Sequence, residues 1–196
     1  MTGPAMPLVA MTREMGSLGR DVAVALARRA GGKVVYHELA APVANKKRQR
    51  KSHVERFLEG KAGIWERLET DRVSSSILTA DETLRALREG SVAVIRGWGG
   101  AQLLKAVPRV VRVRVCAPMA LRVDRMLKRL ASDNREVVQS EIRLSDEAHG
   151  AIVRRHFGLA WDDAASYDMV LNTEYLSVED CVEEIEGLMR KPHFAA

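Results

Sequence analysis

A glycine-bearing turn near the N-terminus constrains the fold of this chain more than any other stretch. Segment 13–20 reads Arg-Glu-Met-Gly-Ser-Leu-Gly-Arg, follows the apolar run 8–11 and opens onto the helical pattern of 21–28. Backbone N–H groups at a helix start are unpaired within the helix and lie at the positive end of its dipole, so they attract anions. The order strand, turn and helix therefore predicts a phosphate-binding turn. Its candidate residues are Arg13, Gly16, Ser17, Leu18, Gly19, Arg20 and Asp21.

This turn is a degenerate form of the Walker A pattern G-x-x-x-x-G-K-[ST]. If Gly19-Arg20 takes the Gly-Lys place, Glu14 stands where the first glycine belongs, and Asp21 stands where a hydroxyl would hold magnesium. A carboxylate can itself ligate Mg²⁺, which makes Asp21 the candidate metal ligand. The alternative is a glycine-bearing turn that only packs.

Composition bounds the class of protein. A chain of 196 residues with 46% hydrophobic content fits one domain with a substantial core, and a net charge of +5 suits an anionic partner. Cys116 and Cys181 are far apart and in no C-x-x-C pattern, which favours reduced core residues. We find no apolar run of about 20 residues and no signal-peptide pattern. We expect a cytoplasmic protein with no membrane partner.

Five apolar stretches that alternate with helical patterns predict a parallel three-layer α/β fold with a five-stranded sheet. The expected strands are 7–12, 33–36, 91–95, 109–116 and 167–171. The expected helices are 21–30, 54–76, 79–90, 119–130, 136–157 and one that Ser177 caps. Residues 191–196 read as a loose tail.

Several charged or glycine-rich stretches add candidate site residues at strand ends or on helix faces. A buried strand is followed by Arg96, Gly97 and Trp98, and we expect a second contact to a bound nucleotide there. The Trp98 ring would either stack on a base or pack in the core. Arg122, Arg125 and Arg129 share one helix face, which is either solvated or suited to phosphate. The run Lys46–Lys51 is either a solvated segment or a segment that binds nucleic acid.

The chain resembles the cytidylate-kinase-like family of P-loop proteins, which are related to nucleoside monophosphate kinases. The resemblance rests on segment 13–20, on Cys116-Ala117-Pro118 and on 167–173, and it runs from about Pro7 to Met189. It implies one P-loop kinase-like domain over 1–190, with an acceptor-binding insertion at about 38–78 and a helical lid at about 119–160. It also implies ATP with Mg²⁺ as the donor.

The resemblance also assigns roles to individual residues. Arg20 would replace the usual lysine, and Asn172 would lie near an adenine. His37 or Glu38 would face the phosphate acceptor, although Glu38 also suits an ordinary helix start. The arginines that would stabilise the transferring group are Arg122, Arg125, Arg154 and Arg155.

The leading hypothesis is a phosphotransferase that moves a phosphoryl group from ATP to a small acceptor such as a nucleoside monophosphate. One alternative is a nucleotide-binding sensor or regulatory module without kinase activity, because Arg20 and Asp21 depart from the Walker A residues. The least favoured alternative is a nucleic-acid-binding protein that uses Lys46–Lys51. A homo-oligomer stays open.

Overall fold

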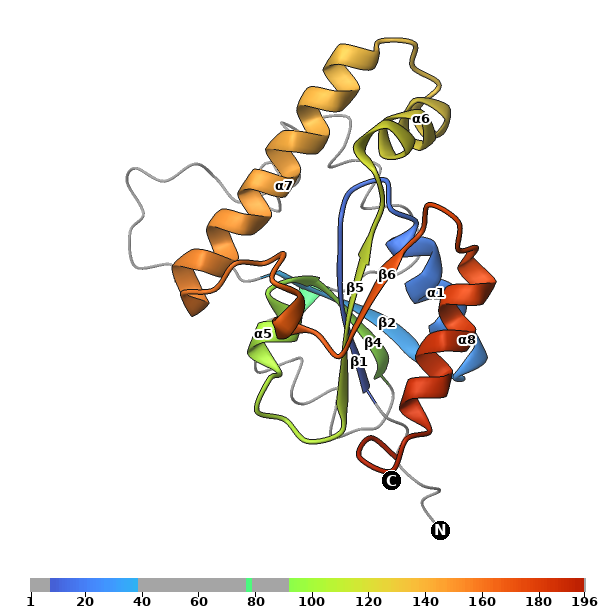
Figure 1. The fold of residues 1–196 in the computed structure, drawn as a ribbon, viewed down its shortest axis with the longest axis vertical. Coiled ribbons are helices and arrows are strands. Elements are labelled where there is room, and N and C mark those ends of the chain that lie inside the picture. The colour runs from blue at the N-terminus through green and yellow to red at the C-terminus, as the bar shows by residue number, and fades with distance from the viewer. Residues whose placement is uncertain (1–7, 39–76, 79–91, 196) are drawn as a thin grey trace.

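The computed structural model describes residues 8–38, 77–78 and 92–195. At the centre of this part lies a parallel sheet with the strand order β3-β2-β4-β1-β5-β6 (Figure 1). The strands are β1 (Leu8–Arg13), β2 (Lys33–Glu38), β3 (Ile77–Leu78), β4 (Val92–Trp98), β5 (Val110–Cys116) and β6 (Met169–Asn172). The chain builds the strands on one side of β1 up to β4 and then crosses to the other side for β5 and β6.

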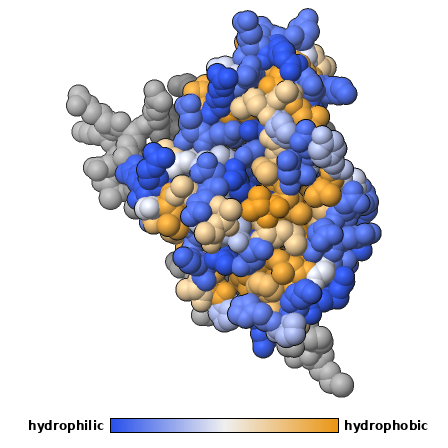
Figure 2. All heavy atoms as spheres, in the orientation of Figure 1, coloured by the Kyte–Doolittle hydropathy of each residue, from blue (hydrophilic) through white to orange (hydrophobic). Residues whose placement is uncertain are grey.

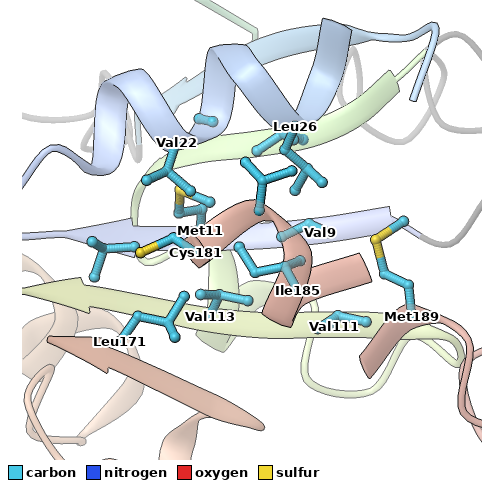
Figure 3. Packing of buried hydrophobic residues seen from close by; sticks show 14 of the residues in the cluster. Val9, Met11, Val22, Leu26, Val111, Val113, Leu171, Cys181, Ile185 and Met189 are labelled. Atoms are coloured by element: carbon cyan, nitrogen blue, oxygen red, sulfur yellow. The ribbon is translucent and has the colours of Figure 1, made fainter. Parts of the chain in front are cut away.

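Helices cover both faces of the sheet, and β1 is therefore buried on both faces. Successive strand residues point to opposite faces. Val9 and Met11 therefore join one core cluster with α1 (Gly19–Arg29) and α8 (Val178–Met189). Figure 3 shows side chains of α1, α8, β1, β5 and β6 meeting in this cluster.

The opposite face of the sheet carries a smaller core. Leu8 and Ala10 of β1 pack there with Ala101 and Leu104, which belong to α5 (Gly100–Leu103) and its C-cap. A 3₁₀ turn, Ala164–Ser166, precedes β6. The result is the three-layer arrangement that the sequence predicts.

Two further helices, α6 (Met119–Leu130) and α7 (Arg135–Phe157), pack against each other beyond the carboxyl edge of the sheet (Figure 1). Asn134 caps α7 by accepting the Val137 N–H at 3.1 Å. Their shared apolar cluster includes Met15 of the turn after β1. The helix pair is therefore docked on the candidate phosphate turn.

The fold class is confirmed, since the five predicted strands correspond to β1, β2, β4, β5 and β6. Helix α6 has the predicted bounds, and Ser177 forms the predicted capping box with Asp180. The two-residue strand β3 was not predicted, because Ile77–Leu78 is too short to show a period. The predicted helices at 54–76 and 79–90 and the basic run Lys46–Lys51 lie outside the described residues.

Two expected strand ends are wrong. His37 and Glu38 are the last residues of β2 rather than residues beyond it, and β4 continues through Trp98. In the segment expected to be a loose tail, Phe194 is 9% exposed and packs in the cluster of α1 and α8, where burial of its apolar ring is favourable.

The surface differs between the helices and the sheet edge. Figure 2 shows hydrophilic residues over α8 and apolar residues in the region of β6. Val170 of this edge strand is 42% exposed. Within the described ranges, no helix is both long and apolar enough to span a membrane.

Candidate functional site

The turn that follows the central strand β1 lies at the carboxyl edge of the sheet, between β4 and β5. β1 pairs with β4 on one side and with β5 on the other, and the chain changes side after β4. In open α/β sheets, ligands bind outside the carboxyl ends of the strands where the order changes in this way. The turn therefore lies where ligands bind in sheets of this kind.

The N-terminus of α1 has the backbone features of an anion site. Its N-cap, Leu18, makes no side-chain capping bond, and the first helical hydrogen bond runs from the Val22 N–H to the Leu18 carbonyl oxygen over 3.0 Å. Gly16 has a φ of 81° and Leu18 has a φ of 62°. A left-handed conformation costs a residue other than glycine about 1–2 kcal/mol, so the surrounding contacts must hold this turn in shape.

A hollow of about 300 Å³ is lined by residues of the turn and of α6. Its basic lining residues outnumber its acidic ones, and this balance suits a phosphorylated ligand. The basic residues are Arg13, Arg20, Arg125, Lys128 and Arg129, and the acidic residues are Glu14 and Asp21. The structure thus brings the predicted residues of the turn together with two of the three arginines of the α6 face, Arg125 and Arg129.

The two glycines of the turn are required by close packing. A Cβ atom on Gly19 would lie 2.6 Å from Cβ of Arg13, and one on Gly16 would lie 2.8 Å from the carbonyl oxygen of Arg122. Ser17 is fully buried, and its Oγ lies 2.8 Å from the Glu14 carbonyl oxygen and 3.0 Å from that of Val115. The Ser17 side chain therefore holds the turn against β5.

Arg122 joins the turn to both helices of the α6–α7 pair. It is 4% exposed; its Nε donates to the Met15 carbonyl oxygen at 2.7 Å, and its NH2 donates to both carboxylate oxygens of Asp146 on α7 at 2.9 and 2.7 Å. Its NH1 lies 3.4 Å from Glu14 Oε2. Burial raises the pKa of Asp146, against the opposing effect of the Arg122 charge. In this arrangement Arg122 holds the turn.

Arg125, one helical turn along the same face, joins the phosphate turn to the end of β6. Its NH1 donates to Thr173 Oγ1 at 2.9 Å and lies 3.5 Å from the Gly16 carbonyl oxygen, and its NH2 donates to the Thr173 carbonyl oxygen at 2.7 Å. Burial lowers the pKa of Arg125. Thr173 was not among the predicted site residues, although it closes the motif 167–173.

Glu14 is a second residue that sequence reasoning did not assign to the site. Its carboxylate accepts from Arg114 NH2 at 2.7 Å and from the Ala117 N–H at 3.2 Å. Arg114 in turn lies 4.9 Å from the ring centre of Trp161. The alternation of Arg112 and Arg114 with valines in β5 could have indicated such an ion pair, because a charged residue on a largely buried strand needs a partner.

The Trp161 ring extends this network to the middle of α7. The ring lies 4.4 Å from that of His149, and a Cβ on Gly150 would lie 3.1 Å from it. His149 is 3% exposed, and burial lowers its pKa to about 3. Its imidazole is therefore neutral near pH 7. The contact between α7 and Trp161 is a contact between two neutral rings.

Asp21 meets the limited requirements of a magnesium ligand. It lies in the first turn of α1, lines the hollow and is 3.7 Å from Arg129, with side chains that are 42% and 38% exposed. Such an exposed pair is weak and is easily exchanged for another partner. In the described part of the chain no group of three or more acidic, histidine or cysteine residues forms a metal cage. Mg²⁺ in phosphate sites needs only one or two carboxylates besides phosphate and water.

The predicted acceptor-binding residues meet at the carboxyl ends of β2 and β4. His37 pairs with Gly97, and Glu38 pairs with Trp98. Arg96 is 4% exposed inside the sheet and pairs with Met11 of β1, so it lies deeper than the sequence suggested.

The remaining predicted residues lie outside the lining of the hollow. Arg154 and Arg155 are exposed in the last turn of α7, where their charge complements the helix dipole. Asn172 is exposed at the end of β6, and its Oδ1 accepts the Glu174 N–H at 3.1 Å. The structure does not bring these three residues to the phosphate turn.

Comparisons with known proteins bear on the family and the fold of the chain. A model of the cytidylate kinase-like family matches residues 8–175. An uncharacterized protein from Eubacterium ventriosum matches with a TM-score of 0.64 at 16% identity, over 94% of this chain and 99% of the other. A gluconokinase from Sinorhizobium meliloti matches with a TM-score of 0.48 at 14% identity, over 96% and 94% of the two chains. Shikimate kinase from Acinetobacter baumannii has a TM-score of 0.46 at 15% identity, over 94% and 93%. No curated protein matches the chain.

Proposed function

This chain belongs to the cytidylate kinase-like family, and on that premise we propose that it is a phosphotransferase that binds ATP with Mg²⁺ in the hollow beside α1. The observation that carries the proposal is the uncapped N-terminus of α1, which opens onto a hollow of about 300 Å³ that five basic residues help to line. Phosphoryl transfer needs positioning and charge stabilisation more than covalent chemistry, and a preformed basic cradle supplies both.

Each part of the site takes one role in this proposal. The backbone of residues 16–20 and the Arg20 guanidinium bind phosphate oxygens, while Arg125 adds charge from α6. Asp21 would hold Mg²⁺, which supplies charge neutralisation of the phosphates when it is bound. The acceptor, of the class of nucleoside monophosphates or other small hydroxylated or phosphorylated molecules, would lie against the ends of β2 and β4.

The roles proposed for the arginines of α6 and α7 differ. Arg122 positions the turn, because its donors already serve Met15, Asp146 and Glu14. Arg154 and Arg155 reach a transferring group only if α7 shifts, since neither lines the hollow. We place the protein in the cytoplasm, where the two free thiols of Cys116 and Cys181 stay reduced.

A second candidate function is nucleotide binding without transfer, as in a sensor or regulatory module. The observation that favours it is the burial of Arg122 in ion pairs with two carboxylates. In that arrangement one charge that could act on a transferring group is already neutralised.

The test is calorimetric titration with ATP and Mg²⁺, alone and with CMP or other nucleoside monophosphates, with ADP measured in the same samples. Binding with acceptor-dependent ADP release supports the phosphotransferase, and binding without turnover supports the second candidate. We expect Arg20→Ala to weaken ATP binding by about tenfold or more, because it removes a charge-assisted contact. Arg28→Ala is the matched control, since Arg28 is exposed near the other end of α1. Equal affinities of wild type and Arg20→Ala would contradict the assignment of the turn.

A further inference from the structure

We infer that Thr173 is a positioning residue of the nucleotide site, which sets the phosphate turn and the Arg125 guanidinium in one geometry through its side-chain hydroxyl. The inference rests on the proposed function, because it assigns Thr173 to the same hollow. Thr173 itself does not line that hollow, so its effect on a ligand passes through the two groups that it holds.

The hydroxyl of Thr173 uses both its donor and its acceptor capacity on parts of the site. Oγ1 donates to the carbonyl oxygen of Ser17, 156 residues away in the chain, at 2.9 Å. The same oxygen accepts from Arg125 NH1 at 2.9 Å. Thr173 is 1% exposed, so water cannot replace either bond without a change of structure.

Arg125 contacts Thr173 and also lines the hollow. Its guanidinium has five N–H donors in a fixed plane. Thr173 takes two of them, through its hydroxyl and its carbonyl oxygen, and Gly16 takes part of a third at 3.5 Å. Because Arg125 also lines the hollow, its remaining donors are available to a phosphate while the plane of the group stays fixed. A fixed plane loses less entropy when it binds a phosphate.

The backbone of Thr173 is held independently of its hydroxyl. The Thr173 N–H donates to the Cys116 carbonyl oxygen at 2.9 Å, which continues the pairing of β5 with β6. Removal of the hydroxyl alone therefore leaves the strand pairing and the bond from Arg125 NH2 to the Thr173 carbonyl oxygen in place. It takes away the bond to the Ser17 carbonyl oxygen and the bond from Arg125 NH1. This separation makes the inference testable by a single isosteric substitution.

The experiment compares Thr173→Val, which has the same shape without the hydroxyl, with Thr173→Ser, which keeps it. ATP and adenosine are titrated into each, and amide hydrogen exchange of residues 16–19 is measured in the ligand-free proteins. We expect Thr173→Val to weaken ATP binding about tenfold and to speed the exchange of these amides. Adenosine binding should not change, and Thr173→Ser should stay within about threefold of wild type for ATP.

A matched control separates positioning from loss of stability. Ser177→Ala removes the N-cap of α8, four residues along the chain and outside the lining of the hollow, and should lower the stability of the fold without a change in ATP affinity. Unchanged exchange of residues 16–19 in Thr173→Val, or wild-type ATP affinity in that variant, would overturn the inference. A wild-type chain that binds no ATP would instead reject the proposed function, and the exchange result would still decide the role of Thr173.

Discussion

At the scale of single residues, His149 shows how the network behind the phosphate turn affects stability. The imidazole is buried beside Trp161, and burial lowers its pKa from 6.5 to about 3. Below pH 6.5 the unfolded chain binds a proton at this residue and the folded chain does not. The free energy of unfolding should therefore fall as the pH drops from about 6.5 toward 3, by up to about 1.4 kcal/mol per pH unit from this residue.

His149→Gln removes this titration and should give a shallower loss of stability between pH 6.5 and 4, with little pH-dependent difference from wild type above pH 7. Urea unfolding followed over this pH range measures the slope. His156→Gln is the matched control, because His156 lies exposed on the same helix. An unchanged slope in His149→Gln would mean that folding does not lower the pKa of His149.

At the scale of elements, the ion pair of Arg122 and Asp146 fastens α7 to α6 and to the phosphate turn. Asp146→Asn removes the negative charge from a carboxylate whose two oxygens both accept from Arg122 NH2, at 2.9 and 2.7 Å. A hydrogen bond to a charged group contributes about 1.5–3 kcal/mol, so we expect a loss of that size in the free energy of unfolding. Hydrogen exchange should show α7 amides opening faster.

Glu147→Gln gives the control for this prediction, because Glu147 is the exposed neighbour of Asp146 on α7. It should change stability by less than about 0.5 kcal/mol. If the two variants behave alike, α7 is held by the apolar contacts of Val138 and Ile142, which are 1% and 0% exposed, rather than by the ion pair.

The elements were predictable from the sequence where the signal is local. The apolar run of β1, the turn and α1 follow one another within about 20 residues, and α6 has a clear helical period, so both were found. β3 was missed because two residues show no period. The ends of β2 and β4 were placed too early, because polar residues and glycine at a strand end read as loop even where pairing continues.

The site was predictable only in part, for a different reason. The residues that hold the turn find partners across the chain: Glu14 is 100 residues from Arg114, and Thr173 is 156 residues from Ser17. No period or short motif reveals such a pair. The sequence showed that the arginines of α6 share one face. It did not show that Arg122 contacts Asp146 while Arg125 contacts Thr173 and lines the hollow, because these contacts depend on the geometry of the fold.

At the scale of the whole molecule, one core connects the two ends of the described chain. The cluster under α1 and α8 contains Val9 near the N-terminus and Phe194 near the C-terminus. The central strand that leads into the phosphate turn therefore shares its packing with the last residues. Stability of the turn depends in this way on a segment that the sequence alone marks as a loose tail.

Phe194→Ala tests this connection. Phe194 is 9% exposed, and the loss of a buried phenylalanine side chain costs about 3–5 kcal/mol. We expect a loss toward the lower end of that range, because the residue lies at the rim of the cluster. Urea unfolding gives the free energy, and Lys191→Ala is the control, since Lys191 is exposed in the same segment and its substitution should cost less than about 0.5 kcal/mol. Equal small losses in both variants would show that the C-terminal residues add nothing to the core, and the loose tail would then be the better description.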